Sequence, residues 1–222
     1  RRGLFSPTAP RCRRCWVAAH HSMPSIASTN PPVLAAIVAA ATERIRVGSG
    51  GVMLPNHAPL VVAEQFALLE AAFPGRVDLG IGRAPGTDQV TAWALRSGAG
   101  GVEADAVDRF PDHVDHVLAM MSPAGAALRL GSGEHVLRAT PHATSVPMIW
   151  LLGSSDFSAR LAASRGLPYV FAHHFSGRGT AEALALYREG YQPSPEHPEP
   201  RTFLTVNVVV APTQAQAQRL VQ

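Results

Sequence analysis

The chain has 222 residues, of which 46% are hydrophobic and 16% are charged, a composition that predicts a globular protein with a sizeable core and excludes a disordered chain. The net charge is only +3, with arginines gathered near the start of the chain, so no basic stripe with interleaved aromatics indicates nucleic-acid binding. No uninterrupted apolar run reaches about 18 residues, which argues against a membrane span.

Residues 1–14 form a segment rich in Arg and Pro, and β-like runs alternate with helical patterns from residue 15 onward. Cys15–His21 predicts the first strand. Asn30 is the expected N-cap of the first helix, which carries Pro31 in its first turn and runs to about Thr42.

Arg44–Leu54 predicts a second strand, interrupted by glycines. The next helix is predicted from an apolar face with helical spacing, formed by Val62, Phe66, Leu69 and Phe73. Gly75 lies where this helix is expected to end. Arg76–Arg83 predicts a third strand, in which apolar residues alternate with Asp78 and glycines.

The stretch 84–146 is less regular and predicts one helix, Pro111–Met121, among glycine-rich turns. Three further strands are predicted from short apolar runs at 148–152, 169–173 and 203–210. A helix is predicted after each of them, beginning at Ser154, Thr180 and Thr213.

Repeated β-then-α units predict an α/β fold with a parallel sheet covered by helices. The pattern alone leaves a closed barrel and an open, doubly wound sheet as alternatives. A complete (β/α)₈ barrel usually has about 250 residues, so this chain is short for one.

Two groups at predicted strand ends indicate anion binding. Arg83 follows the third strand, where its planar fork of donors suits a phosphate, and a surface arginine in a tight turn is the alternative. The glycines before Arg83 do not complete the G-x-G-x-x-G fingerprint of dinucleotide-binding folds, because Pro85 stands in place of the third glycine. Ser154 and Ser155 open a helix, whose free N–H groups bind anions, and simple N-capping explains the same two residues.

Histidine doublets end two predicted strands, at His20-His21 and His173-His174. Neighbouring strand residues point to opposite faces, so each doublet supplies at most one inward side chain. Without a carboxylate triad they predict no metal site. A general base or a substrate-orienting histidine is the functional interpretation, and an ordinary histidine at the rim of the fold is the alternative.

Glycines interrupt the second strand at Gly48, Gly50 and Gly51. Glycines weaken a strand unless a bulge or a close approach to the backbone requires them. A flat aromatic ring lying against Gly50 and Gly51 is one such reason, and a plain bulge is the other.

The cysteines Cys12 and Cys15 form a single C-x-x-C without a second ligand pair. This spacing favours two free thiols in a reducing cytosol over a zinc site. No secretory pattern follows the first arginines, so we expect a cytoplasmic location.

Five motifs occur in one order from Trp16 onward, at residues 16–24, 46–57, 63–66, 75–86 and 152–155. Together they resemble the bacterial-luciferase-like, flavin-dependent monooxygenases. The resemblance implies an α/β fold of the (β/α)₈ TIM-barrel type that is incomplete, with about six of the eight β/α units in residues 15–222. Where that family usually has glutamate before the histidine pair, this chain has Ala19.

Carried over position by position, the resemblance implies that His20 is the catalytic histidine. Gly50 and Gly51 correspond to a non-proline cis peptide held against the flavin ring. The positions implied to bind the FMN phosphate are Arg83, Ser155 and Ser158. Those implied to supply backbone near the flavin are Leu152, Gly153 and Ser154. No metal ligand is implied.

The resemblance further implies that reduced FMN and molecular oxygen oxygenate a small organic substrate such as an aldehyde or ketone. A separate NAD(P)H-dependent flavin reductase would supply the reduced flavin transiently, and assembly as a homodimer is left open. Three alternatives stand beside this interpretation: a deazaflavin-dependent hydride-transfer enzyme of the same fold, a non-catalytic flavin-binding fragment, and a scaffold without a ligand.

Overall fold

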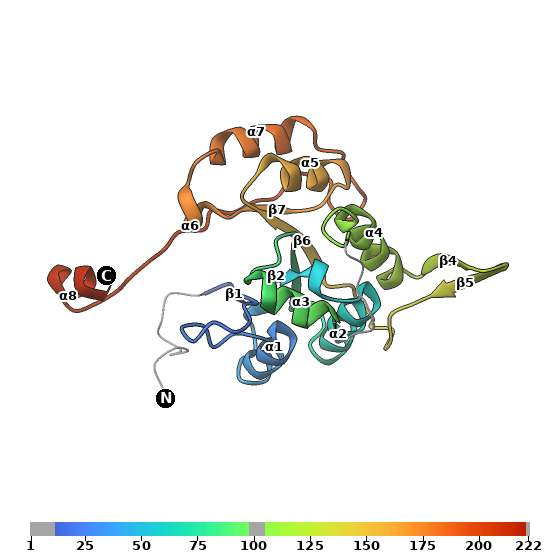
Figure 1. Cartoon of the computed structure of the whole chain (residues 1–222), viewed down its shortest axis with the longest axis horizontal. Helices are drawn as coiled ribbons and strands as arrows, with labels where there is room; N and C mark the ends of the chain where they lie inside the picture. The colour runs from blue at the N-terminus through green and yellow to red at the C-terminus, as the bar shows by residue number, and fades with distance from the viewer. Residues whose placement is uncertain (1–11, 98–104, 221–222) are drawn as a thin grey trace. The chain divides into compact units, whose positions relative to one another are not determined.

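The computed structural model describes residues 12–97 and 105–220 (Figure 1). Of the Arg- and Pro-rich segment at 1–14, only the last three residues are therefore described, and the glycine-rich turn expected at 98–101 lies outside the described residues. The chain divides into two compact units, the first ending at Leu152 and the second beginning at Gly153.

The first unit is built on four parallel strands. They are β1 (Arg14–Val17), β2 (Arg46–Met53), β3 (Val77–Gly82) and β6 (Met148–Gly153), and they are neighbours in that order. Each neighbouring pair is parallel, which confirms the predicted parallel sheet. The strands therefore present their carboxyl ends, where ligands bind in such folds, along one edge.

The sheet of the first unit is curled. Trp16 on β1 and Trp150 on β6 lie with ring centroids 5.4 Å apart although β2 and β3 stand between their strands. All six residues of β3 are buried, as is expected of a parallel strand covered on both faces. Asp78 and the glycines that alternate with the apolar residues are buried as well, because both faces of β3 are covered. A curled parallel sheet is the part of the predicted barrel that the described residues show.

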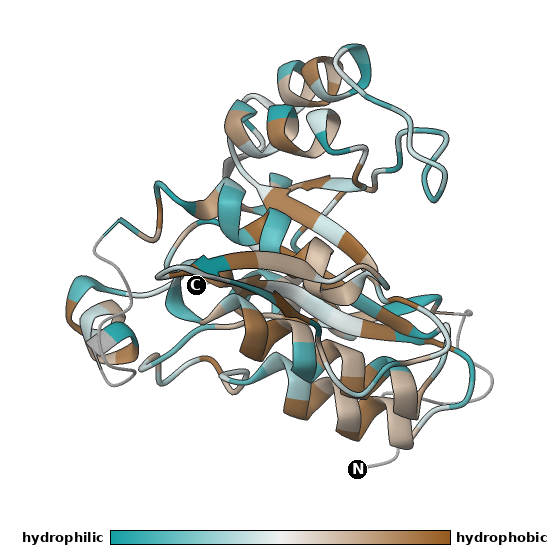
Figure 2. Ribbon diagram, turned by 90° about the vertical axis from the view of Figure 1, so that its right-hand side faces the viewer, coloured by the Kyte–Doolittle hydropathy of each residue, from teal (hydrophilic) through white to brown (hydrophobic). Residues whose placement is uncertain are grey.

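Two helices cover this sheet. In α1 (Pro31–Ala40) the Asn30 side chain caps the helix by accepting a hydrogen bond from the Val33 N–H at 3.3 Å, as predicted. A short 3₁₀ turn, η1 (Leu54–Asn56), precedes α2 (Pro59–Ala72). The predicted apolar face of α2 is buried at Val62, Phe66 and Leu69. Helix α1 packs on β2 and α2 on β3, and both carry brown apolar stretches in Figure 2.

The rest of the first unit departs from the sequence-based expectations. Strand β1 ends at Val17, so His20 and His21 lie in the loop after it and not on a strand. Helix α3 (Gln89–Ser97) and an antiparallel hairpin were not predicted, whereas α4 (Phe110–Met121) was. The hairpin consists of β4 (Ala126–Leu130) and β5 (Gly133–Leu137), which project beyond α4 in Figure 1.

The second unit contains one short strand and four helices among its described residues. They are α5 (Asp156–Ser164), β7 (Tyr169–Phe171), α6 (His173–Ser176), α7 (Thr180–Glu189) and α8 (Gln214–Leu220). Tyr169 and Tyr187 form its core, with both side chains fully buried and ring centroids 5.4 Å apart. Burial raises the pKa of the Tyr187 hydroxyl to about 12, and this hydroxyl donates to the Leu167 carbonyl at 2.9 Å.

The predicted sixth strand at 203–210 is wrong. The segment begins beside β7, where the Tyr169 N–H donates to the Arg201 carbonyl and the Thr205 hydroxyl donates to the Phe171 carbonyl. It then leaves β7 without forming a ladder, and Val208 and Val210 are 70% and 84% exposed. A β-rich composition forms a strand only where a neighbouring strand accepts and donates hydrogen bonds. Thr213 does cap α8, as predicted, by accepting from the Gln216 N–H.

Candidate functional site

The carboxyl-terminal halves of β2 and β3 approach each other more closely than side chains allow. A Cβ on Gly51 would lie 2.9 Å from the Gly80 carbonyl oxygen, and one on Gly80 would lie 2.2 Å from the Ser49 carbonyl oxygen. The buried Ser49 hydroxyl bridges the two strands, donating to the Gly80 carbonyl and accepting from the Gly80 N–H at 2.8 and 3.0 Å. A smooth backbone surface results, with Leu152 of β6 beside it.

The Gly50–Gly51 peptide bond is cis, as the resemblance implied. The strand register shifts between Gly50 and Val52, so the bulge that the sequence left as an alternative is present. A Cβ added at Gly50 would lie 3.2 Å from the Trp16 ring, a tight contact. The Trp16 side chain therefore already disfavours a larger residue at this position, and contact of a flavin ring with the backbone stays a prediction.

His20 is held in one orientation by the loop that follows β3. Its Nδ1 lies 2.8 Å from the Gly86 carbonyl oxygen. A carbonyl oxygen only accepts hydrogen bonds, so Nδ1 carries the proton and Nε2 of the neutral ring is the basic nitrogen. The His20 backbone N–H donates to the Ser28 carbonyl at 3.1 Å, which anchors the loop after β1. His20 is thus a half-buried base at the carboxyl end of the sheet.

A second histidine, His57, lies directly after η1 and is half-buried. Burial lowers its pKa below the usual 6.5, and the charge of protonated His21 lowers it further. His57 therefore binds a proton less strongly in the folded chain than in the unfolded chain. This end of the sheet holds the imidazole of His57 neutral near pH 7.

We expect His57 to make the stability of the chain fall under mildly acidic conditions. Its stabilising contribution is complete above the unfolded pKa of 6.5 and is lost as the pH falls from there toward the lower folded pKa. His57→Gln should flatten the fall in the free energy of unfolding between about pH 7.5 and 5.5, measured by urea titration. Burial also lowers the pKa of His197, so the stability of His57→Gln should still fall somewhat with decreasing pH.

The matched control is His135→Gln, since His135 is exposed on the hairpin. That variant should keep the pH profile of the parent chain. A His57→Gln profile that coincides with the parent profile would show that His57 titrates alike in the folded and unfolded states.

Arg83 and Leu152 come together at the carboxyl end of the sheet. Leu152 is paired in register with Gly82 of β3, and Arg83 is the next residue of the chain. Both side chains are half-buried. The first unit therefore brings two of the predicted cofactor residues to adjacent strand ends.

The serines of the predicted phosphate site belong to the second unit. Ser155 is the N-cap residue of α5, yet its side chain makes no capping hydrogen bond. Capping by the Ser155 hydroxyl, one alternative that the sequence left open, is therefore wrong. Ser154 and Ser155 are exposed, whereas Ser158 is buried and fills the space beside Gly153, where a Cβ would lie 2.5 Å from its Oγ. A shared phosphate contact with Arg83 stays a prediction.

The second histidine doublet does not end a strand. His173 and His174 begin α6, and each Nδ1 is hydrogen-bonded to a threonine hydroxyl, of Thr180 at 2.8 Å and Thr205 at 3.0 Å respectively. These contacts tie α6 to its neighbours within the second unit. They support the structural alternative for this doublet.

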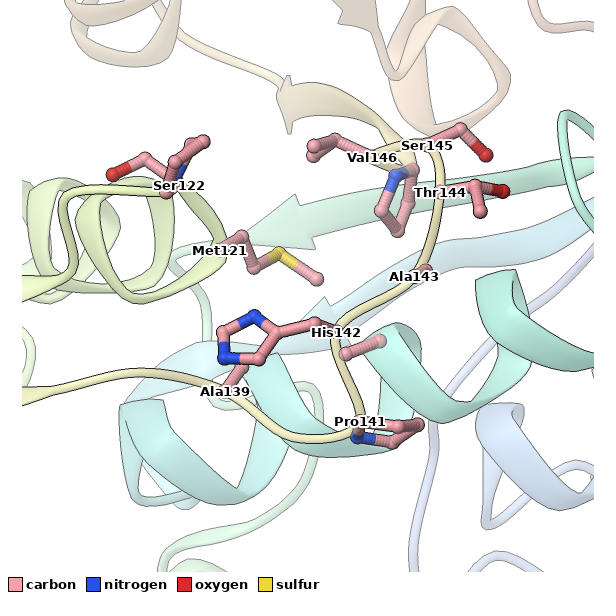
Figure 3. Close-up of a pocket in the computed structure, with 12 residues that line it drawn as sticks. Met121, Ser122, Ala139, Pro141, His142, Ala143, Thr144, Ser145 and Val146 are labelled. Carbon is pink, nitrogen blue, oxygen red and sulfur yellow. The ribbon is translucent and has the colours of Figure 1, made fainter.

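A pocket of about 340 Å³ lies at the opposite end of the first unit's sheet. It is formed by the loop 139–147, which leads into β6, together with Ala67 of α2 and the end of α4. His142 and Met121 point toward each other across it in Figure 3. None of the predicted site residues lines this pocket.

Within residues 12–97 and 105–220, no three His, Cys, Asp or Glu side chains are grouped as a metal site would require. Among the same residues, no helix is long and apolar enough to cross a membrane.

Comparison with known proteins identifies the family. The model of the family described as luciferase-like monooxygenase matches residues 13–222. The chain belongs to the luciferase-like monooxygenase family. This confirms the resemblance carried by the five sequence motifs.

Several curated relatives of this family cover most of the chain. The Bacillus subtilis protein YvbT is 47% identical over 208 residues, which are 93% of this chain and 58% of YvbT. An Escherichia coli luciferase-like monooxygenase is 42% identical, again over 93% of this chain and 58% of the relative. An N-acetyl-S-alkylcysteine monooxygenase of B. subtilis is 35% identical over 93% of this chain and 59% of its own length. The chain thus spans less than two thirds of these relatives.

Solved structures resemble most of the chain as well. Apo-MsnO8 has a TM-score of 0.79 and 40% identity, covering 93% of this chain and 58% of MsnO8. The oxygenating constituent of a Pseudomonas putida 3,6-diketocamphane monooxygenase, in complex with FMN, has a TM-score of 0.64 at 19% identity, covering 94% and 60% of the two chains. An F420-dependent secondary alcohol dehydrogenase has a TM-score of 0.62 at 17% identity, covering 86% and 59%. The last two show a shared fold alone.

Three polar residues that tie this sheet and its loops together escaped the sequence-based prediction. Ser49 joins β2 to β3, Asn56 binds the loop after β3, and Asp78 gathers polar partners from β1 and β2. Asn56 lies within the sequence motif at residues 46–57, and its polar side chain in that motif was the available signal. The role of Asn56 depends on its contact with Pro85, 29 residues away, which no local sequence pattern reveals.

Proposed function

We propose that this protein binds reduced FMN at the carboxyl ends of its strands and oxygenates a small organic substrate, such as an aldehyde or ketone, with molecular oxygen. Membership of the luciferase-like monooxygenase family supports the reaction class. The observation that carries the proposal is His20, a base whose proton-bearing nitrogen is fixed by the Gly86 carbonyl at the ligand-binding edge of the sheet.

The residues of the first unit fit a flat ring with a phosphate tail. The bulged Gly50–Gly51 segment presents backbone without side chains, which permits close approach of a planar ring. Arg83, at the end of β3, offers a planar fork of five donors that suits a phosphate. In the second unit, the Ser155 hydroxyl is not used for capping, and α5 contributes free N–H groups at its start.

When bound, reduced FMN supplies the electrons with which molecular oxygen is activated. His20 accepts or returns a proton at Nε2 while the Gly86 carbonyl holds its ring. The buried strands β2 and β3 keep water from one side of the site. Arg83, Ser155 and Ser158 would hold the phosphate of FMN, and backbone from Leu152 to Ser154 would border its ring.

The proposal includes two kinds of partner besides the substrate. A separate NAD(P)H-dependent reductase delivers the reduced flavin. A second copy of the chain is the other partner. Exposed apolar side chains on α1 and α2 support a homodimer through those helices: Val33, Ile37, Val61 and Leu68.

Loss of the Arg83 guanidinium should weaken FMN binding. Arg83→Ala removes charge-assisted hydrogen bonds worth about 1.5–3 kcal/mol, so the dissociation constant should rise by a factor of about 10 to 150. Flavin fluorescence titration measures it. Arg83→Lys keeps the positive charge but lacks the planar fork of donors, so its dissociation constant for FMN should lie between those of the parent chain and Arg83→Ala.

Arg129→Ala is the matched control, because Arg129 is exposed on the hairpin strand β4. A folded Arg83→Ala chain that binds FMN as tightly as the parent chain would remove Arg83 from the site. Circular dichroism of each variant establishes that it is folded.

The oxygenation itself is tested with ¹⁸O₂. The chain, reduced FMN and a panel of aldehydes, ketones and thioethers are mixed, and products are examined by mass spectrometry. Incorporation of one labelled oxygen atom supports a monooxygenase. Binding of FMN without labelled product indicates a flavin-binding fragment. Tighter binding of a reduced deazaflavin, with hydride transfer and no label, indicates the deazaflavin alternative, and no flavin binding by a folded chain contradicts the proposal.

A further inference from the structure

The short segment Pro85–Thr87 is held by three hydrogen bonds to two other loops of the first unit. The Asn56 side-chain amide donates to the Pro85 carbonyl at 2.8 Å. The His20 Nδ1 donates to the Gly86 carbonyl at 2.8 Å, and the Thr87 hydroxyl donates to the His21 carbonyl at 3.1 Å. The loops that follow β1, β2 and β3 are therefore joined at this one segment, which we call the clamp segment.

Asn56 is itself tightly placed. It is only 5% exposed and ends the 3₁₀ turn η1, whose three residues are all buried. Its Nδ2 faces the Pro85 carbonyl, which only accepts, and its Oδ1 faces the Arg96 guanidinium of α3 at 3.4 Å, which only donates. Both neighbours therefore fix the same orientation of the amide.

The backbone of the clamp segment leaves little freedom at Gly86. Its φ is +67°, and a Cβ there would lie 2.9 Å from Met53 Cγ and 3.3 Å from the Ala19 carbonyl oxygen. Gly86 thus lies close against Met53 and Ala19, at a position that only glycine fits. The Asn56 bond to the preceding residue is the side-chain hydrogen bond that ties this segment to the loop after β2.

We propose that Asn56 is a positioning residue for His20: by holding the Pro85 carbonyl it aims the Gly86 carbonyl at Nδ1 and so keeps the proton of the neutral imidazole on Nδ1 and the basic lone pair on Nε2. This rests on the proposed function in one respect, because His20 matters to the reaction only if it serves as the base. The tautomer itself is a property of the chain without flavin.

The difference between the tautomers has a chemical consequence. A neutral imidazole released from the Gly86 carbonyl populates both Nδ1–H and Nε2–H forms. In the Nε2–H form the nitrogen that we assign to proton transfer is a donor and not a base. Asn56 thus acts through His20 and the Gly86 carbonyl, at a distance from the reacting atoms.

Asn56→Asp tests this without a change of shape. An aspartate has no donor for the Pro85 carbonyl but still accepts from Arg96. Ring ¹⁵N–¹H correlation spectra of the full chain at pH 8, without flavin, distinguish a protonated from an unprotonated nitrogen at each position. His20→Gln assigns the signals. The parent chain should show His20 as a single Nδ1–H species, and Asn56→Asp should show a mixture with a substantial Nε2–H fraction.

Thr87→Val is the second variant, in case Asn56→Asp does not fold. It removes the third bond of the clamp segment at a half-buried position and should shift the tautomer ratio in the same direction. Thr91→Val is its control, because Thr91 is half-buried like Thr87 but its hydroxyl donates to Asp88, outside the clamp segment. This variant should leave the His20 ring spectra unchanged.

The inference is overturned if His20 of the parent chain is the Nε2–H form, or if folded variants keep the pure Nδ1–H form. The flavin titration is read separately. A chain that shows the expected tautomer shift and binds no FMN would contradict the proposed function while the positioning by Asn56 holds. A chain that binds FMN with an unmoved tautomer would contradict only the role of Asn56.

Discussion

Replacing Asp78 by asparagine should destabilise the first unit by about 3 kcal/mol, at the lower end of the cost of breaking a buried ion pair. The Asp78 side chain has no exposed surface and accepts from Arg14 at 3.0 Å, from Arg46 at 2.7–2.8 Å and from the Trp16 indole at 2.9 Å. The variant leaves two arginines without their carboxylate. Their side chains are 33% and 25% exposed, so water offsets part of the loss.

The position of this ion cluster explains why a single carboxylate matters so much. Arg14 lies on β1 and Arg46 on β2, paired in register, while Asp78 lies on β3. The carboxylate therefore joins three strands at the end opposite His20. The Arg14 guanidinium also lies over the Trp150 ring of β6, 5.4 Å from its centroid, so the cluster extends across the curled face of the sheet.

Asp156→Asn is the control for this prediction. Asp156 pairs with Arg160 on the surface of α5, where both side chains are more than 60% exposed, and such a pair contributes less than about 1 kcal/mol. Urea unfolding of the three chains, followed by tryptophan fluorescence, measures the difference. Equal midpoints for the parent chain and Asp78→Asn would mean that solvent replaces the carboxylate at no cost.

Elements whose signals are local were predicted well from the sequence. Asn30 and Pro31 mark the start of α1 because capping and a missing N–H act within one turn. Gly75 lies two residues beyond Phe73, the C-cap of α2, and has a φ of +74°, a conformation that glycine adopts without strain. Thr213 caps α8 for the same local reason as Asn30.

Elements that depend on distant partners were not predicted. The valine-rich segment at 203–210 has the composition of a strand but forms no ladder. Strands β4 and β5 form a two-stranded sheet of their own, in which each strand depends on pairing with the other. Asp78 is a polar residue that alternates with apolar ones, a pattern also found on strands with one exposed face. Its place at the centre of a buried ion cluster depends on the packing of both faces of β3.

The candidate site divides in the same way. The sequence motifs assigned His20, Gly50 and Gly51 to the site, because a resemblance carries positions along the chain. The contacts that orient the site residues join parts of the chain that are far apart in sequence, 66 residues for the bond from His20 to Gly86 and 29 residues for that from Asn56 to Pro85. Histidine chemistry depends on the partner of each ring nitrogen, and a sequence shows no partner.

Gly80→Ala should be the most damaging methyl group that can be added to this sheet at its ligand-binding end. The new Cβ would lie 2.2 Å from the Ser49 carbonyl oxygen and 2.8 Å from Leu152 Cδ1, and a strand backbone cannot move away without breaking its ladder. We expect a loss of about 3 kcal/mol or more, the upper range for overpacked interiors. Gly82→Ala, on the same strand, meets the flexible end of Met53 at 3.1 Å and should cost less than about 1 kcal/mol.

Ser49→Ala separates crowding from lost hydrogen bonds, because it removes both bonds of the Ser49 hydroxyl to Gly80 without adding an atom. Its cost should be about 1–2 kcal/mol, between those of the two alanine variants of β3, in the same urea titration. The consequence for function follows from register: Gly80 is paired with Gly50, so a methyl group that forces β3 from β2 also displaces the backbone proposed to border the flavin. Gly80→Ala should therefore lose FMN binding, while Gly82→Ala should keep it. If the two variants have equal stability and equal FMN affinity, the close approach of β2 and β3 is not needed at Gly80.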